Sequence, residues 1–483
     1  MRRSEHEDSL RRVAAELSFE TTDEMVEACL DNALALEEDT DVLYDDPDPV
    51  KEAGHASSDE YNALLAVYDE PRRRSDDGSL DDLSLAVKDS ITVEGLRMTA
   101  GSKDFSLVPA NDAIVVERLL DAGAAIVGKA NLEAFAFGIT GENSDFGMVS
   151  NPVAEDTVPG GSSSGSAVAV AGGLVDAAIG TDAGGSVRIP AACCGLVGAK
   201  TTHRLVPRHG LVDFAPSMDT IGPIGHDVET VARVLDVIAG HDLRDPSSSR
   251  VEVGSFVKAL DDTDDLSVGV PESLLDPATD GVTDTVLDLA ERLDERPSVT
   301  VSDVDLELGS ITTAYLIISA AEFAWVLRQT DAIRGPSAAP SEELRAAVAR
   351  AKADGVSSPH LAWRVLAGAY LDVLTDGKAY TAAREEVIAL QERLDALFDD
   401  VDVLLAPTLR RLPPGFGEIE TLEDTIDMLG NPSVFNLTGN PAVAVPAGEV
   451  DELPVSAMFV APHFEDGRAL AAARLAERVT EGN

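Results

Sequence analysis

The chain has 483 residues, 44% of them hydrophobic, and a formal net charge of -50 from 87 acidic and 37 basic side chains. This length allows one large domain or several domains with a sizeable core, and three cysteines without a Cys-x-x-Cys spacing exclude a disulfide framework. Acidic residues occur along the whole chain, which disfavours nucleic acid and anionic membranes as partners and is typical of proteins from a cytoplasm of very high salt.

The N-terminus shows no targeting segment. The first residues, MRRSEHEDSLRR, are charged and lack the apolar stretch of a signal peptide. The chain also has no run of 18 or more apolar residues, the minimum for a transmembrane helix. We therefore expect a soluble cytoplasmic protein.

Helix and strand patterns alternate along the chain. Helices are predicted at 10–40, 112–122, 131–137, 167–174, 226–240, 379–398 and 467–480. Strands are predicted at 83–87, 124–127, 177–180, 402–406, 442–445 and 455–460, with a strand and turn at 195–201. This alternation predicts an α/β fold, with the acidic stretches 240–265 and 335–358 as insertions on one core.

A Gly-x-Ser-x-Gly pattern centred on Ser163 lies in the segment GGSSSGS, residues 160–166. In many Ser-His-Asp hydrolases this pattern forms a turn between a strand and a helix, with the serine as nucleophile. Here the polar stretch 155–159 precedes the glycines, so the required strand is missing. None of the eight histidines lies in a telling pattern. Ser163 is therefore not predicted to be the nucleophile.

Lys88 ends the apolar run 84–87, and a buried lysine is costly unless it serves a purpose. Burial lowers the pKa of a lysine, and a neutral amine accepts a proton. The alternative is a surface lysine that pairs with Asp89. From the residues alone, both interpretations stay open.

A second serine, Ser186, follows two glycines in GTDAGGSVRIPA, residues 180–191. The glycines allow a close approach of substrate to the backbone. Four N–H groups at the start of the following helix are candidate donors to a developing oxyanion: those of Ala183, Gly184, Gly185 and Ser186. The alternative is a tight turn with a helix-capping serine.

Taken together, these segments resemble the amidase signature family. The resemblance is carried by GGSSSGSAVAVAGGLVDAAIGTDAGGSVRIPAACCGLVGAKTT and continues in SLAVKDSITVEG, AAIVGKANLEAFAFG, MDTIGPIGHDVE, VLLAPT, NLTGNPAVAVPAG and PVSAMFVAP. These motifs run in the family's order from about residue 80 to the C-terminus. The resemblance implies a central mixed, twisted sheet covered by helices, residues 66–483, and leaves residues 1–65 as an N-terminal helical segment.

The family resemblance implies a Ser-Ser-Lys triad. Matched residue by residue, Ser186 is the nucleophile, Ser162 is the bridging serine after a cis peptide bond, and Lys88 is the base. Ser163 becomes a neighbour in the same loop. Asp182 and Arg188 flank the nucleophile, and we expect them to pair and brace its loop. The resemblance implies an acyl-serine intermediate and no metal or organic cofactor.

The main interpretation is a stand-alone amidase that acts on a small-molecule amide, without nucleic acid or membrane, as a possible homodimer. One alternative is the glutamine-hydrolysing A subunit of the tRNA-dependent amidotransferase. That protein holds glutamine with an arginine and an aspartate, where ungapped counting places Val387 and Leu429, although Arg384 and Asp427 lie close. Another alternative is a non-catalytic binding protein, disfavoured because all three triad residues are present.

The acyl group of the substrate is not evident from the sequence. Pocket residues are expected within 310–375. The candidates are Phe135, Phe137, Met218, Ile318 and Trp325, and core packing is the favoured role for each.

Overall fold

The computed structural model describes residues 3–16, 19–40, 51–328 and 359–482, which fall into two units. The N-terminal unit contains helices α1 (Arg3–Glu16) and α2 (Asp23–Thr40), which bury Ala14, Val26 and Leu30. Thr22 accepts a hydrogen bond from the Met25 N–H at 3.2 Å and so caps the start of α2. Among the described residues, the second unit holds all the other elements, from residue 51 onward.

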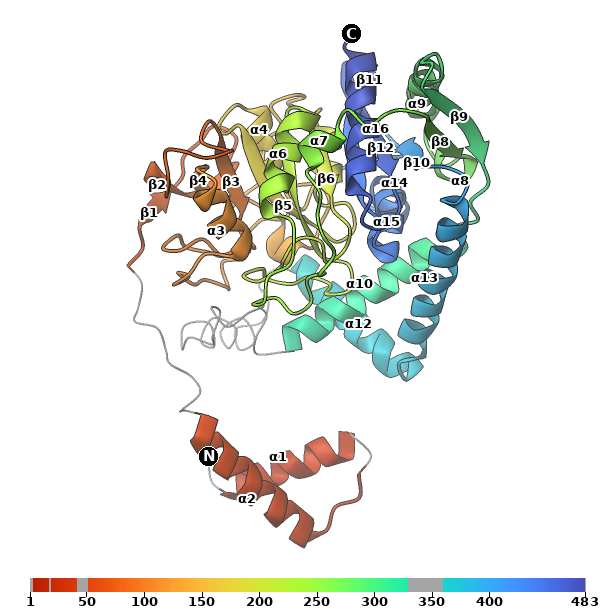
Figure 1. Ribbon diagram of the computed structural model, residues 1–483. Helices are drawn as coiled ribbons and strands as arrows, with labels where there is room; N and C mark the ends of the chain where they lie inside the picture. Colours follow the sequence, from red (N-terminus) through yellow and green to blue (C-terminus); the bar gives the residue numbers. More distant parts are fainter. Residues whose placement is uncertain (1–2, 17–18, 41–50, 329–358, 483) are drawn as a thin grey trace. The chain divides into compact units, whose positions relative to one another are not determined.

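The second unit is organised around one mixed sheet of twelve strands in the order β1-β2-β4-β3-β5-β7-β6-β11-β12-β10-β8-β9 (Figure 1). The strands are β1 (Gly54–Ala56), β2 (Leu64–Arg72), β3 (Ser84–Lys88), β4 (Ala125–Ala130), β5 (Ala177–Asp182), β6 (Val197–Lys200), β7 (Thr220–Gly225), β8 (Leu266–Pro271), β9 (Val299–Val304), β10 (Val403–Pro407), β11 (Ala442–Val450) and β12 (Leu453–Val460). β3 is parallel to both of its neighbours, β4 and β5, whereas β5 and β7 are antiparallel.

The described part of the second unit also contains helices. They are α3 (Ile114–Asp121), α4 (Ser164–Ala171), α5 (Arg188–Cys193), α6 (Val228–Ile238), α7 (Phe256–Ala259), α8 (Glu272–Leu275), α9 (Asp280–Asp294), α10 (Ile311–Arg328), α12 (Pro359–Thr375), α13 (Lys378–Leu397), α14 (Leu422–Leu429), α15 (Pro432–Thr438) and α16 (Asp466–Thr480), with a 3₁₀ turn η1 at Ala134–Ala136. Helices α10, α12 and α13 pack on one another.

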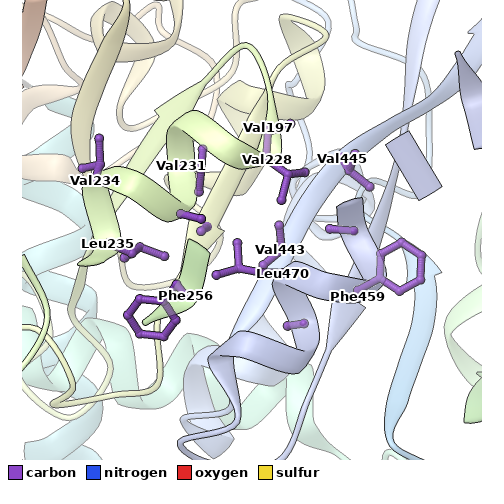
Figure 2. Packing of buried hydrophobic residues seen from close by; sticks show 14 of the residues in the cluster. Val197, Val228, Val231, Val234, Leu235, Phe256, Val443, Val445, Phe459 and Leu470 are labelled. Carbon is purple, nitrogen blue, oxygen red and sulfur yellow. The ribbon is translucent and has the colours of Figure 1, made fainter. Parts of the chain in front are cut away.

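The core is built mainly from aliphatic side chains (Figure 2). Val231 and Leu235 of α6, Leu470 of α16, Val443 of β11 and Phe459 of β12 belong to this core cluster, and all five are almost fully buried. Burial of a side chain of this kind contributes about 1.5–3 kcal/mol to folding. No helix in the described ranges is long and apolar enough to cross a membrane.

Two of the predicted segments have a different structure from the one expected. The helix predicted at 131–137 is only the turn η1, because Phe135 and Ala136 adopt left-handed φ values of 52° and 60°. The carboxylate of Glu133 accepts hydrogen bonds from the N–H groups of Thr140, Gly141 and Asn143, which holds the chain in a loop.

The second departure concerns the N-terminal segment. We expected helical structure up to residue 65, but β1 and the start of β2 already belong to the sheet. Of the two expected insertions, 240–265 is a loop that contains the short helix α7, and 335–358 lies outside the described residues.

Candidate active site

Lys88 lies at the C-terminal end of β3 and is fully buried. Its Nζ is 2.8 Å from Ser162 Oγ and 2.8 Å from Thr181 Oγ1. Burial lowers the pKa of Lys88 to about 7, although the negative charges of Asp182, Asp219 and Glu133 favour the protonated amine. The neutral amine of Lys88 is therefore populated near neutral pH. The Ser162 hydroxyl lies close enough to transfer a proton to it.

Asp89 does not pair with Lys88. Successive side chains along an extended segment point to opposite faces. Asp89 Oδ1 lies 3.3 Å from the Nζ of Lys129, on the neighbouring strand β4. Its Oδ2 accepts hydrogen bonds from the N–H and the hydroxyl of Thr99 at 2.8 and 2.6 Å. The surface alternative for Lys88 is thus excluded.

The serine-rich loop brings Ser162 and Ser163 into different environments. The peptide bond between Gly161 and Ser162 is cis. Ser163 Oγ donates to the Thr181 carbonyl oxygen at 3.2 Å and accepts from the Thr181 N–H at 3.3 Å, so it ties the loop to β5. Both serine side chains are fully buried, but only Ser162 contacts the lysine.

Ser186 follows β5 and precedes α5. Helix α5 has no side-chain cap from its N-cap residue, and the Asp182 carboxylate instead accepts the N–H groups of Gly185 and Val187 at 2.8 and 3.1 Å. Ser186 therefore does not serve as a helix cap. Its carbonyl oxygen accepts the Ser163 N–H at 3.2 Å, which joins the two serine segments.

An ion pair holds the Ser186 loop. Arg188 Nε donates to Asp182 Oδ2 at 3.0 Å, and Nη2 donates to Asp182 Oδ1 at 3.0 Å. Asn436 Nδ2 donates to the same carboxylate at 2.7 Å. Burial opposes ionisation of Asp182, but Arg188 and Asn436 outweigh it and hold the pKa of Asp182 well below its usual range.

Replacing Arg188 by methionine is expected to lower the free energy of unfolding by about 3–5 kcal/mol, because it leaves the Asp182 carboxylate buried without its cation. Chemical denaturation in concentrated KCl measures this loss. Arg233→Met is the matched control, since its ion pair with Asp82 is partly exposed and contributes at most about 1 kcal/mol. Equal losses in the two variants would contradict the bracing role of Arg188.

Three of the four expected oxyanion donors line the candidate site. The Gly185 N–H already donates to Asp182, whereas Ala183, Gly184 and Ser186 line a cavity of about 820 Å³. Gly185 has a φ of 121°, which favours glycine, and a Cβ at Gly184 would collide with the Tyr315 hydroxyl. The two glycines are thus required by the backbone path and by the close approach of Tyr315.

Ser162, Thr181 and Ser186 line the same cavity, together with side chains from α10, α12 and α14. Of the expected pocket residues, Phe137 lines it. Phe135, Met218 and Ile318 are buried in the surrounding core. Trp325 is 54% exposed and lines a separate hollow.

Sequence reasoning assigned no role to four residues that the structure brings to the site: Thr181, Asp219, Tyr315 and Asn436. Thr181, Asp219 and Asn436 lie inside the motifs that carry the family resemblance. The sequence therefore pointed to these segments, but it did not predict which groups the three residues contact. Tyr315 lies in a segment without such a motif.

Comparison with known proteins identifies the family. The family model described as Amidase matches residues 25–470. The chain is 42% identical over 422 residues to the A subunit of glutamyl-tRNA(Gln) amidotransferase from Natronomonas pharaonis, covering 85% of this chain and 98% of that protein. The protein of the same name from Haloarcula marismortui is also 42% identical, with 86% and 98% covered.

Two solved structures support the same conclusion. The A subunit of glutamyl-tRNA(Gln) amidotransferase from Thermotoga maritima superposes with a TM-score of 0.71 at 30% identity, over 86% of this chain and 87% of that one. The peptide amidase of Stenotrophomonas maltophilia gives a TM-score of 0.66 at 29% identity, over 84% of both chains.

These relatives correct the prediction about partners. We expected a small-molecule amide, no nucleic acid and a possible homodimer. The relatives of Natronomonas and Haloarcula, however, carry a name that specifies one component of a multi-subunit enzyme acting on a tRNA. The net charge on which the prediction rested describes the whole chain and does not identify local binding surfaces.

The motifs, the sheet topology and the similarity over most of the chain agree with one another. The chain belongs to the amidase signature family and is an enzyme that hydrolyses amide bonds.

Proposed function

We propose that Ser186 is the nucleophile of this amidase, Ser162 the proton relay and Lys88 the base. The observation that carries the proposal is the 2.8 Å contact between Lys88 Nζ and Ser162 Oγ, fully buried beside a cavity that Ser162 and Ser186 both line. A lysine in this environment has no role as a surface charge. It is suited to accept a proton from a hydroxyl.

In the proposed reaction, neutral Lys88 accepts the proton of Ser162 while Ser162 accepts the proton of Ser186. The Ser186 Oγ attacks the amide carbonyl, and the N–H groups of Ala183, Gly184 and Ser186 stabilise the oxyanion. The proton returns through Ser162 to the leaving nitrogen as the C–N bond breaks. Water then hydrolyses the acyl-serine ester by the same relay and restores all three groups.

The proposed base predicts a pH dependence. Only the neutral form of Lys88 accepts a proton, and the pKa of Lys88 is about 7. Below that pH the neutral fraction falls about tenfold per pH unit, so kcat/KM is expected to fall with the same slope and to level off above it. A pH profile of amide hydrolysis in concentrated KCl measures this, and a rate independent of pH between about 5 and 7 would argue against Lys88 as the base.

We further propose glutamine as the amide, with the released ammonia passed to a tRNA-dependent amidotransferase reaction. The support is the 42% identity to proteins of that name over 98% of the length of the Natronomonas protein. The test is ammonia release from glutamine by the chain alone and with partner subunits plus aminoacyl-tRNA added. The assay is run in multimolar KCl, because the net charge of -50 suits high salt.

One observation favours a second candidate, the hydrolysis of another amide. Leu429 stands where the glutamine-holding aspartate is expected and lines the cavity with an apolar side chain, and Val387 is fully buried in the core. The guanidinium of Arg384 already donates a hydrogen bond, from Nη1 to Ser217 Oγ at 3.3 Å. A panel of aliphatic, aromatic and peptide amides run beside glutamine decides between the candidates by the highest kcat/KM.

A further inference from the structure

The charged side chains that line the cavity, among the described residues, are all acidic. Among its lining residues in the described part of the chain, three carry carboxyl groups, namely Glu142, Asp219 and Glu420, and none is a lysine or an arginine. Glu142 and Glu420 are solvent-accessible, whereas Asp219 is only 3% exposed. A buried carboxyl group at a cavity wall interacts with whatever group of the ligand comes to lie against it.

The sheet register places Asp219 beside the reacting groups. Strands β5 and β7 are antiparallel, with Asp182 opposite Thr220, so Asp219 lies across from Ala183, where the Ser186 loop begins. The Thr220 hydroxyl donates to the Asp182 carbonyl oxygen at 3.1 Å and fixes the two strand ends. Asp219 thus lines the same cavity as Ser162, Thr181 and Ser186.

The Asp219 carboxylate is held rigidly by the backbone. Its Oδ2 accepts the N–H groups of Phe214 and Ala215 at 2.9 Å each. Burial and the nearby Asp213 raise the pKa of Asp219 to about 7, although Arg208 favours the ionised form. A cation that enters from the cavity would stabilise the ionised carboxylate further, without a need for the chain to reorganise.

We propose that Asp219 determines specificity by binding an ammonium group of the amide substrate. The inference rests on the proposed function of the Ser186 site and deepens it by naming the substrate class, an amide whose acyl part carries a primary ammonium. Glutamine belongs to this class through its α-ammonium. Asp219 takes no part in the bond cleavage itself, so its loss weakens binding more than turnover.

The test compares substrates that differ only in the ammonium group. For the wild type, kcat/KM is expected to be higher for glutamine than for glutaric acid monoamide, and higher for 5-aminopentanamide than for pentanamide. Asp219→Asn retains an acceptor oxygen for Phe214 and Ala215. It is expected to raise KM for the two ammonium substrates by roughly 10- to 100-fold, the effect of losing a hydrogen bond to a charged group. KM for the other two amides stays within about threefold, within the scatter of such effects.

Asp213→Asn is the matched control. The negative charge of Asp213 raises the pKa of Asp219, but Asp213 is not among the residues that line the cavity. This variant is expected to keep or lower KM for the ammonium substrates. Equal KM changes for both members of a pair in Asp219→Asn, or a wild-type preference for the uncharged amides, would overturn the inference. Preference for 5-aminopentanamide with no cleavage of glutamine overturns the glutamine proposal alone, and Ser186→Ala with full activity overturns the site itself.

Discussion

Ser186→Ala is expected to reduce kcat for amide hydrolysis by on the order of 10⁴- to 10⁶-fold, because it removes the atom that forms the acyl ester in the proposed reaction. The substituted side chain is small and only 8% exposed, and the backbone groups that hold its loop stay in place. The expected loss is therefore one of turnover and not of folding. Ammonia release in concentrated KCl, with the unfolding midpoint measured beside it, separates the two.

Two serines of the neighbouring loop are matched controls. Ser164 Oγ is buried and makes no hydrogen bond within the described residues, so Ser164→Ala is expected to leave both activity and stability nearly unchanged. Ser163→Ala loses two contacts with Thr181 and is expected to cost about 1–3 kcal/mol of stability while turnover persists. Activity that survives in Ser186→Ala but disappears in Ser163→Ala would reverse the assignment of the nucleophile.

Lys88→Met is expected to lower kcat/KM by on the order of 10³- to 10⁴-fold at about pH 8, because no other base in the described structure contacts Ser162 Oγ. Methionine has a similar length and fits an apolar environment, so the strand end is expected to stay packed. The measurement is the full pH profile with pentanamide, an uncharged amide whose binding does not depend on Asp219. In this profile the rise through about pH 7 that the neutral amine is proposed to produce should be absent.

Lys200 provides a matched control for Lys88. It is also fully buried, and burial lowers its pKa to about 7, but its Nζ donates only to the backbone oxygens of Thr201 and Asn440, at 2.8 Å each. Lys200→Met is expected to lower stability and to leave the pH profile of the remaining activity unchanged. A loss of the step near pH 7 in Lys200→Met with its retention in Lys88→Met would show that the base is Lys200 and not Lys88.

The triad candidates were accessible from the sequence because each lies in a motif that carries the resemblance to the amidase signature family. Lys88 ends a strand, Ser162 precedes a helix, and Ser186 follows two glycines. What the sequence left open was which partner each residue meets. Asp89 is adjacent to Lys88 in the chain, yet its partner Lys129 comes from a neighbouring strand. Pairing of this kind depends on strand order, which a single sequence does not specify.

Other features depended on distant parts of the chain. Periodicity predicted a helix at 131–137, but the Glu133 carboxylate bonds to N–H groups up to ten residues away and produces a loop. Strand β7, with the sequence TIGPIG, was missed because glycine and proline normally interrupt strands. The cavity draws on α10, α12 and α14, which no local motif connects to Ser186.

The prediction about partners failed for an electrostatic reason. A net charge of -50 disfavours the binding of nucleic acid only if the protein's charges repel the phosphates over a long distance. At the salt concentration for which such a composition is suited, the Debye length is about 3 Å at 1 M, so distant repulsion largely disappears. Local contacts then decide binding, and composition contains no information about them.

Trapping of the intermediate tests whether amide cleavage proceeds through an ester on Ser186. The wild type is mixed with glutamine or the best amide of the panel, quenched in acid within milliseconds, digested and analysed by mass spectrometry. We expect the added mass of the acyl group on Ser186 of the wild type and its absence from Ser186→Ala. An acyl group on Ser162 or Ser163, or continued turnover by Ser186→Ala, would contradict it.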